Sequence, residues 1–227
     1  MDLFSIFDPQ TFMFSMNWAS ASFGVILVFP VYWTVTGRIS RMLSMLFEFL
    51  NFEIKLSLSP ITTPVIGHLT ISLFTFIAMN NFMGLMPYIF TSTSHLTFSL
   101  TFALFMWMSV ISASVILNLG GFLAHLVPTG TPALLTPFMV LIELVSNLIR
   151  PLTLSVRLAA NMVAGHLLIC LLTSPMPTMF TPVLMLACVA LVAMLMLETA
   201  VAVIQAYVFM TLTSLYLGEV NSMVAVK

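Results

Sequence analysis

The stretch of sequence that decides the fold is Leu152–Leu172, LTLSVRLAANMVAGHLLICLL, an apolar run that contains Arg157. A run of about 20 mainly apolar residues is long enough to cross the hydrocarbon core of a bilayer as a helix. No acidic residue within it can neutralise the arginine. Because a guanidinium does not give up its proton in a protein, the chain must hold a permanent positive charge at membrane depth. Such a charge is costly and is typical of a functional site.

The composition of the whole chain also indicates an integral membrane protein. Hydrophobic residues make up 61% of the sequence and charged residues only 6%, whereas a soluble domain carries about 25% charged residues. The net charge of -1 offers no basic field for nucleic acid. Cys170 and Cys188 lie in apolar runs and indicate neither a metal motif nor a disulfide framework. No Lys or Arg precedes Arg38, so we expect insertion without a basic leader.

We expect one membrane domain over residues 1–227, an all-α integral membrane protein with about five membrane helices and one interfacial amphipathic helix. Turn-rich segments separate the apolar runs. The predicted order is a first spanning helix within 1–37, an interfacial helix over 38–57, two spanning helices within 64–127, and a long, strongly tilted hairpin over 133–220.

The segment 38–57 has the pattern of an amphipathic helix. Its polar residues recur at alternating steps of three and four, namely Arg41, Ser44, Glu48, Asn51 and Lys55. This spacing puts them on one helical face, so the helix should lie in the membrane interface instead of crossing it. Three of the six basic residues lie in or at the edge of this segment: Arg38, Arg41 and Lys55. The positive-inside rule therefore places it on the matrix or cytoplasmic side, with the N-terminus in the opposite compartment.

The last two apolar runs are too long to stand upright in a bilayer. Ala133–Leu172 spans 40 residues, about 60 Å as a helix and roughly twice the hydrocarbon thickness. Pro151 interrupts it, and because helical periodicity resumes at once we predict a kink and not an end. Turn residues at 173–177 close a hairpin, and Val183–Leu217 returns over about 52 Å.

These two predicted helices hold nearly all the ionisable groups at membrane depth, which mark ion or substrate pathways in membrane proteins. The groups are Glu143, Arg150, Arg157, His166 and Glu198, with Gln205 and Tyr207 as polar companions. At 100° per residue, Arg157 shares a face with Ala160 and Ala164, whose short side chains let another helix approach the charge. A second stripe, which Tyr207 faces away from, consists of Glu198, Ala202, Gln205 and Phe209.

Several motifs resemble subunit a of the rotary ATP synthase, in its mitochondrial form, over nearly the whole chain. The most specific is PLTLSVRLAANMVAGH at 151–166, together with Gln205. Others are NNFMGLMP at 80–87, ELVSN at 143–147 and ETAVAVIQ at 198–205. The resemblance implies a stator proton-channel subunit of the mitochondrial inner membrane. The positive-inside rule applied to 38–57 then predicts an N-terminus in the intermembrane space. The resemblance further implies a proton-translocating part of the enzyme, and no glycine-rich phosphate loop indicates a nucleotide site in this chain.

The resemblance also implies partners and residue roles. A ring of rotor c subunits would carry one carboxylate each, which Arg157 keeps ionised while blocking proton leak. Two offset half-channels would carry the protons, with Glu143 on the matrix side and His166 with Glu198 on the intermembrane-space side. Asn161 and Gln205 would lie near the arginine, and Tyr207 would join the path. Further partners are the other membrane-sector and peripheral-stalk subunits and the lipid bilayer, with no cofactor and no metal.

Three other classes of protein remain to be weighed. A haem-carrying redox subunit needs paired axial histidines, whereas the four histidines here are scattered. An antiporter-like proton-pumping subunit of a respiratory complex is a closer rival, but such pumps use buried lysines. Lys55 and Lys227 are the only lysines, and neither lies within a predicted span. A passive membrane anchor would give Arg157 no task.

Overall fold

The computed structural model describes residues 7–10, 15–22, 24, 37–57, 63–86, 89–127, 132 and 135–225. Every regular element in these ranges is helical, which confirms the all-α fold class. The elements are η2 (Met16–Ala19), α2 (Arg38–Ser57), α3 (Thr63–Leu85), η4 (Ser92–Ser94), α4 (Leu96–His125), α5 (Thr136–Thr173), η5 (Met176–Thr178) and α6 (Thr181–Ala225).

Within the described ranges, four helical segments are long and apolar enough to cross a membrane: Gly67–Leu85, Leu96–Ile116, Thr136–Thr178 and Thr181–Glu219. They correspond to the two central spans and the two hairpin helices expected from the sequence. The first expected span, within 1–37, falls largely outside the described residues. Helix α2 has the predicted bounds of the interfacial segment and is not among these four.

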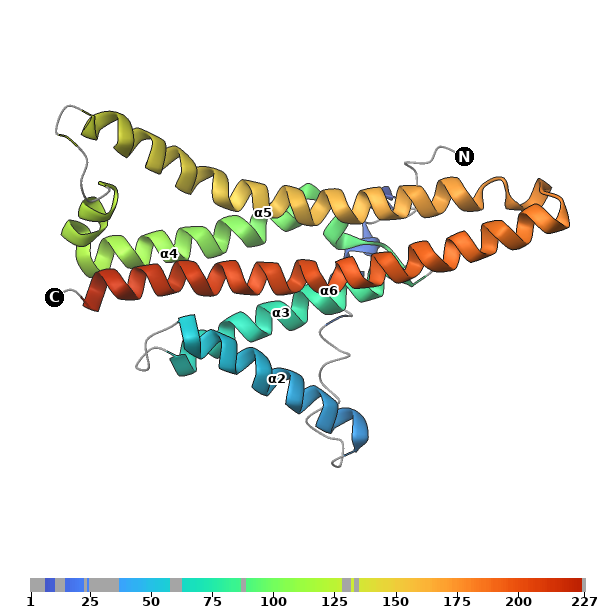
Figure 1. Cartoon of the computed structure of the whole chain (residues 1–227), viewed down its shortest axis with the longest axis horizontal. Helices are drawn as coiled ribbons and strands as arrows, with labels where there is room; N and C mark the ends of the chain where they lie inside the picture. Colours follow the sequence, from blue (N-terminus) through green and yellow to red (C-terminus); the bar gives the residue numbers. More distant parts are fainter. Residues whose placement is uncertain are drawn as a thin grey trace.

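Helices α5 and α6 form the predicted antiparallel hairpin, and the short helix η5 lies at its turn (Figure 1). Pro151 lies inside α5, and the helix continues past it, as predicted. A proline cannot donate the hydrogen bond that would close the preceding turn, so a helix bends there. Figure 1 shows the first part of α5 diverging from α6 before the two helices run side by side.

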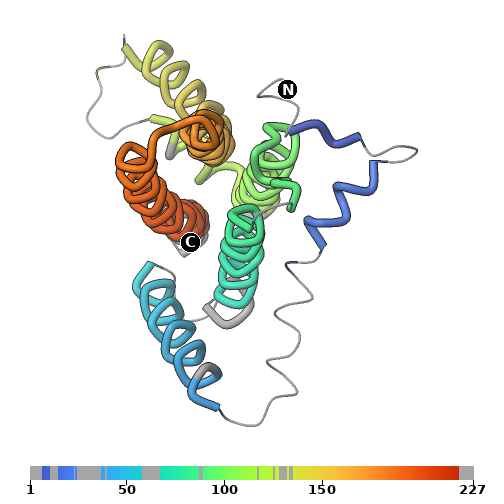
Figure 2. The backbone as a smooth tube through the Cα atoms, turned by 90° about the vertical axis from the view of Figure 1, so that its right-hand side faces the viewer, coloured from blue at the N-terminus to red at the C-terminus, as the bar shows by residue number. Residues whose placement is uncertain are grey.

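The core lies where α3, α4, α5 and α6 meet, and Figure 2 shows these helices gathered with α2 to one side. Its buried members are Ile77, Ala78, Ala103, Met106, Leu154, Leu158, Ala206 and Phe209. Alanines from α3, α4 and α6 allow close helix approach, which drives packing where lipid removes the hydrophobic force between helices. Leu154 and Leu158 fix the inward face of α5, so its opposite face is turned outward.

Helix α4 contains a break that was not predicted from the sequence. Asn118 has a non-helical backbone, with φ -157° and ψ 84°. The N–H of Gly121 donates a hydrogen bond to its side-chain oxygen at 3.1 Å. This is the contact that an N-cap residue makes with the third residue of a new helix. The chain therefore restarts a short helix before the connection to α5.

Helix α2 packs against α3 and α6 through one of its apolar faces. Leu50 and Ile54 are buried against Met210 of α6. Two glycines allow the approach, Gly67 on α3 beside Asn51 and Gly218 on α6 beside the backbone oxygen of Ser57. The other apolar face of α2 is exposed, with Met42, Met45, Leu46, Phe49, Phe52 and Leu56. Its place in the membrane interface stays a prediction.

Substitution by alanine should have opposite effects at these two glycines. A Cβ at Gly218 would lie 2.5 Å from the Ser57 carbonyl oxygen, so Gly218→Ala must displace α2. At Gly67 the nearest atom would be 3.7 Å away, and alanine favours a helix by up to about 1 kcal/mol. We expect Gly218→Ala to lower the melting temperature in detergent and Gly67→Ala to preserve or raise it. Equal melting temperatures would contradict the described seating.

Candidate functional site

The most deeply buried acid of the described residues is Glu198, which faces His166 across the hairpin. Their side chains are only 5% and 16% exposed, and Nε2 of the histidine lies 3.6 Å from Oε1 of the glutamate. Neither these nitrogen and oxygen atoms nor Oε2 has a hydrogen-bond partner among the described protein groups. The ring of Phe7 stands edge-on to the imidazole, with centroids 6.4 Å apart. The structure thus brings together the two residues that the sequence analysis paired.

Gly165 is the reason that Glu198 fits against α5. A Cβ at this position would lie 2.7 Å from Oε1 of Glu198 and 2.8 Å from its carboxyl carbon. Atoms do not pack at such separations, so only glycine leaves room for the acid. Gly165 belongs to the motif at 151–166, but the sequence alone indicates no role for it. It precedes His166 directly and thereby brings the acid to the imidazole.

The predicted stripe on α6 is buried along its length. Glu198, Ala202, Gln205 and Phe209 are each less than 9% exposed. Asn81 of α3, also fully buried, donates a hydrogen bond from Nδ2 to the backbone oxygen of Ala202 at 3.2 Å. The sequence analysis did not select Asn81, although an amide pair within an apolar run was a usable signal. Gln205 therefore points into the helix assembly.

Arg157 lies on the outward face of α5. It is exposed, as are Thr153, Ala160 and Ala164 along the same face, and Asn161 beside them is half-buried. No carboxylate of the described residues is within ion-pair distance of its guanidinium. The flanking side chains on this face are short, as the sequence predicted. A permanent cation therefore stands on a surface that another helix could approach closely.

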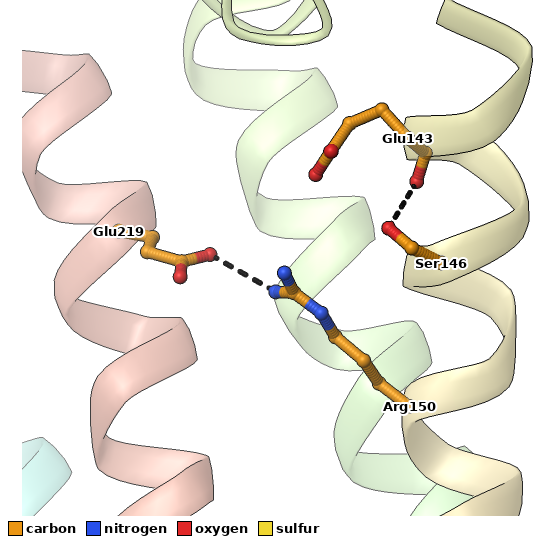
Figure 3. Close-up of polar contacts among 4 residues, drawn as sticks. All are labelled: Glu143, Ser146, Arg150 and Glu219. Carbon is orange, nitrogen blue, oxygen red and sulfur yellow. Dashed lines mark hydrogen bonds and ion pairs between the residues drawn. The ribbon is translucent and has the colours of Figure 1, made fainter. Parts of the chain in front are cut away.

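A second charged cluster lies nearer the beginning of α5 (Figure 3). Arg150 Nη1 is 3.5 Å from Oε2 of Glu219, and its guanidinium lies 5.2 Å from the ring centroid of Tyr216. Glu143 extends from the same side of α5 in Figure 3, and Ser146 donates a hydrogen bond to its backbone oxygen. The sequence analysis missed Glu219, because nothing in its local pattern pairs it with a residue 69 positions away.

A cavity of about 250 Å³ adjoins this cluster between α4, α5 and α6. Its polar lining comes from Ser114, Asn147, Arg150, Tyr216 and Glu219. The remaining walls are mostly apolar, with Trp107 among them. The volume is large enough for several water molecules, each of which occupies about 30 Å³.

Tyr207 does not join either cluster. Its hydroxyl donates a hydrogen bond of 2.8 Å to Oε2 of Glu53 on α2. This direction agrees with the prediction that Tyr207 faces away from the stripe of Glu198 and Gln205. Glu53 was missed, since it lies off the polar face that the sequence analysis recognised in α2. The contact links α2 to the hairpin, and a place of Tyr207 in the site stays a prediction.

The chain is thus of the class of helical integral membrane proteins whose long hairpin carries ionisable groups along its length. The sequence model of the family described as ATP synthase A chain matches residues 11–218. ATP synthase subunit a of Drosophila melanogaster is 48% identical over 221 residues, covering 97% of this chain and 99% of that protein. For Aedes aegypti the identity is 47% over 224 residues, with the same coverage. For Locusta migratoria it is 46% over 221 residues, covering 96% and 98%.

The chain belongs to the ATP synthase A chain family. It is accordingly a membrane-sector subunit of that enzyme complex, which confirms the resemblance found in the motifs. The membership favours neither a haem-carrying redox subunit nor an antiporter-like pump.

Gly165→Ala tests the fit of Glu198 against α5. Because the atom in the way is the end of a flexible side chain, the carboxylate can swing aside without moving the backbone. We expect the assembled complex to form in normal amount, with the His166 to Glu198 distance increased in its structure and ATP synthesis reduced severalfold. Gly120→Ala, where the nearest atom is 3.7 Å away, is the control. If the distance between His166 and Glu198 is unchanged in Gly165→Ala, Glu198 does not pack against Gly165 as described.

Proposed function

We propose that this chain is the stator proton-channel subunit of a rotary ATP synthase in the mitochondrial inner membrane. Two offset half-channels deliver protons to and from carboxylates on a rotor ring of c subunits. Other membrane-sector and peripheral-stalk subunits hold it against the ring. No nucleotide binds to this chain, so ATP chemistry takes place on a partner.

The observation that carries the proposal is the position of Arg157. It is exposed on a face of short side chains of α5, and no acid of the described residues lies within ion-pair distance of it. Leaving a permanent charge there is unfavourable unless an acid of another chain meets it. A carboxylate in lipid is protonated, and a neighbouring cation favours its ionised form. Each rotor acid that reaches Arg157 would therefore release its proton.

Arg157 would also act as the seal between the two half-channels. A proton that crossed at this level without rotation would need a group able to take it up and pass it on. A guanidinium stays protonated and cannot do so. Rotation of the ring is then the only way for a proton to pass from one side to the other.

The Glu198 and His166 pair is suited to the half-channel on the intermembrane-space side. Histidine is the side chain whose charge changes most readily near physiological pH. A carboxylate and an imidazole 3.6 Å apart, with or without a water between them, can exchange a proton. Gln205 lies two turns further along the same buried stripe, in the direction of the arginine, and Asn161 lies one turn from Arg157 on α5.

The cluster near the beginning of α5 is suited to the matrix side. Glu143 and Glu219 supply carboxylates there, and the cavity beside Arg150 supplies space for water. The pair of Arg150 and Glu219 is about one-third to one-half exposed, so its net stabilisation is at most about 1 kcal/mol. Such a pair can open and close readily and need not obstruct a path.

The contact between α2 and α6 supports this assignment of sides. Gly218 of α6 touches Ser57 at the end of α2, and the basic residues of α2 favour the matrix side. The end of α6 that carries Glu219 would then face the matrix, and the turn of the hairpin would face the intermembrane space. The N-terminus, before α2, would lie in the intermembrane space. Residues 150 and 166 are about 24 Å apart along α5, which offsets the two paths.

Arg157→Ala tests the central residue. We expect ATP synthesis coupled to proton flow to fall at least about 100-fold, since a preorganised charge at a reacting centre is worth that much, while the assembled complex persists. Thr153→Ala, one turn away on the same exposed face, should leave the rate near normal. Both are measured as ATP synthesis by energised membrane vesicles, with complex content from native gels. A normal rate in Arg157→Ala refutes the proposal.

A double-mutant cycle tests the partnership of His166 and Glu198. Residues in direct contact show non-additive effects, here about fivefold or more in the rate of proton flow. We expect His166→Gln combined with Glu198→Gln to be little worse than the more damaging single change. If the two effects multiply as independent events, the pair does not act as one unit.

A further inference from the structure

The connection between α3 and α4 is a polar loop that is buried in the protein. Thr91, Ser92, Thr93 and Ser94 are each no more than 6% exposed. Loops of this composition normally run over the surface, where water satisfies their polar groups. Inside the loop, Thr91 Oγ1 donates to Ser94 Oγ at 3.0 Å, and Ser94 Oγ donates to the Thr91 carbonyl oxygen at 2.7 Å. Thr93 Oγ1 and His95 Nε2 have no protein partner.

The loop packs against the part of α5 that leads to His166. Gly84 of α3 makes this possible, because a Cβ there would lie 2.8 Å from Cγ2 of Thr91 and 3.6 Å from Cε of Met162. Met162 is one helical turn before His166. On the other side, the rings of Trp18 and Phe90 lie 5.3 Å and 5.1 Å from the imidazole of His95. The loop therefore lies between an aromatic cluster and the buried pair.

All the unpartnered buried side-chain polar atoms of the described residues lie in this region. They are Asn81 Oδ1, Thr93 Oγ1, His95 Nε2, His166 Nε2, Glu198 Oε1 and Glu198 Oε2. Asn81 is tied to Ala202, one turn after Glu198, and Glu198 lies against Gly165. The six atoms belong to five residues on α3, the loop, α5 and α6, which these contacts connect.

The free energy lost by burying polar atoms without hydrogen bonds indicates that water enters this region. Each buried polar atom without a partner costs about 1–3 kcal/mol. Native proteins avoid this cost by holding ordered water at polar, roomy positions. A hydroxyl can donate and accept at once, and imidazole nitrogens can do either. A row of such groups is suited to continue a chain of hydrogen-bonded water.

We infer that the loop Thr91–His95 is the hydrated inlet through which protons reach His166 and Glu198 from the intermembrane-space side. This rests on the proposed function of that pair. Thr93 and His95 are positioning residues that hold the water chain by their free hydroxyl and Nε2. A proton enters at the loop, passes along hydrogen-bonded water and leaves through Glu198, so no bond other than those to the proton changes.

The test removes one hydroxyl while keeping the side-chain shape. In the intact complex, Thr93→Val should lower proton-driven ATP synthesis severalfold at normal complex content, and Thr93→Ser should restore it. A larger solvent deuterium isotope effect on the rate should accompany the loss in Thr93→Val, which a purely structural role would not produce. Thr101→Val, at an exposed threonine whose hydroxyl donates only to its own helix, is the matched control and should leave the rate unchanged.

Glu198→Gln separates this inference from the function on which it rests. If Glu198→Gln blocks synthesis while Thr93→Val has a normal rate, the inlet is elsewhere and the proposed function stands. If Glu198→Gln has a normal rate, the proposed function of the pair fails and the inlet fails with it. Should Thr93→Val not assemble, a map of the unsubstituted complex decides the matter. Ordered water on Thr93 Oγ1 supports the inlet, and a dry loop overturns it.

Discussion

A permanent positive charge on the outward face of an apolar helix is the constraint around which this chain is arranged. Arg157 cannot be neutralised by losing a proton, and α5 buries Ser155, Ala159 and Met162 on the opposite side. The arginine is therefore directed away from the core by the same periodicity that packs the helix. Short side chains along its face keep the charge accessible to a neighbouring helix. The two hairpin helices are longer than the hydrocarbon core is thick, and a helix accommodates such excess length by tilting.

The charged pairs of the hairpin differ in what they can contribute. Arg150 and Glu219 are partly exposed, so solvent screening leaves their attraction small and the packing of α3 to α6 must hold the fold. Glu198 is buried, His166 is largely so, and their facing nitrogen and oxygen atoms have no hydrogen-bond partner. Such an arrangement costs stability unless water completes it. Buried ionisable groups of this kind are typical of functional sites. The stable part of the molecule is thus apolar, and its polar part is suited to transport.

The parts of the structure that the sequence predicted are those set by local periodicity. The bounds of 38–57, the passage of α5 through Pro151 and the buried stripe of Glu198 and Gln205 all follow from spacing along one helix. The break at Asn118 was missed because the apolar pattern continues on both sides of it. Only a single side-chain cap, on the N–H of Gly121, marks the interruption. Glu53, Glu219 and Thr93 were missed for another reason. Their importance comes from contacts or burial between distant segments, which no pattern within one segment encodes.

The side chain that faces Arg157 in the assembled enzyme shows most directly whether this residue meets a rotor acid or lipid headgroups. A map of the intact complex that resolves this side chain would decide it. The prediction is an acidic side chain of a rotor helix opposite the guanidinium, close enough to be bridged by a single water, with the short residues of α5 against that helix. A guanidinium in contact with phospholipid headgroups, remote from any acid of another polypeptide, would contradict the account.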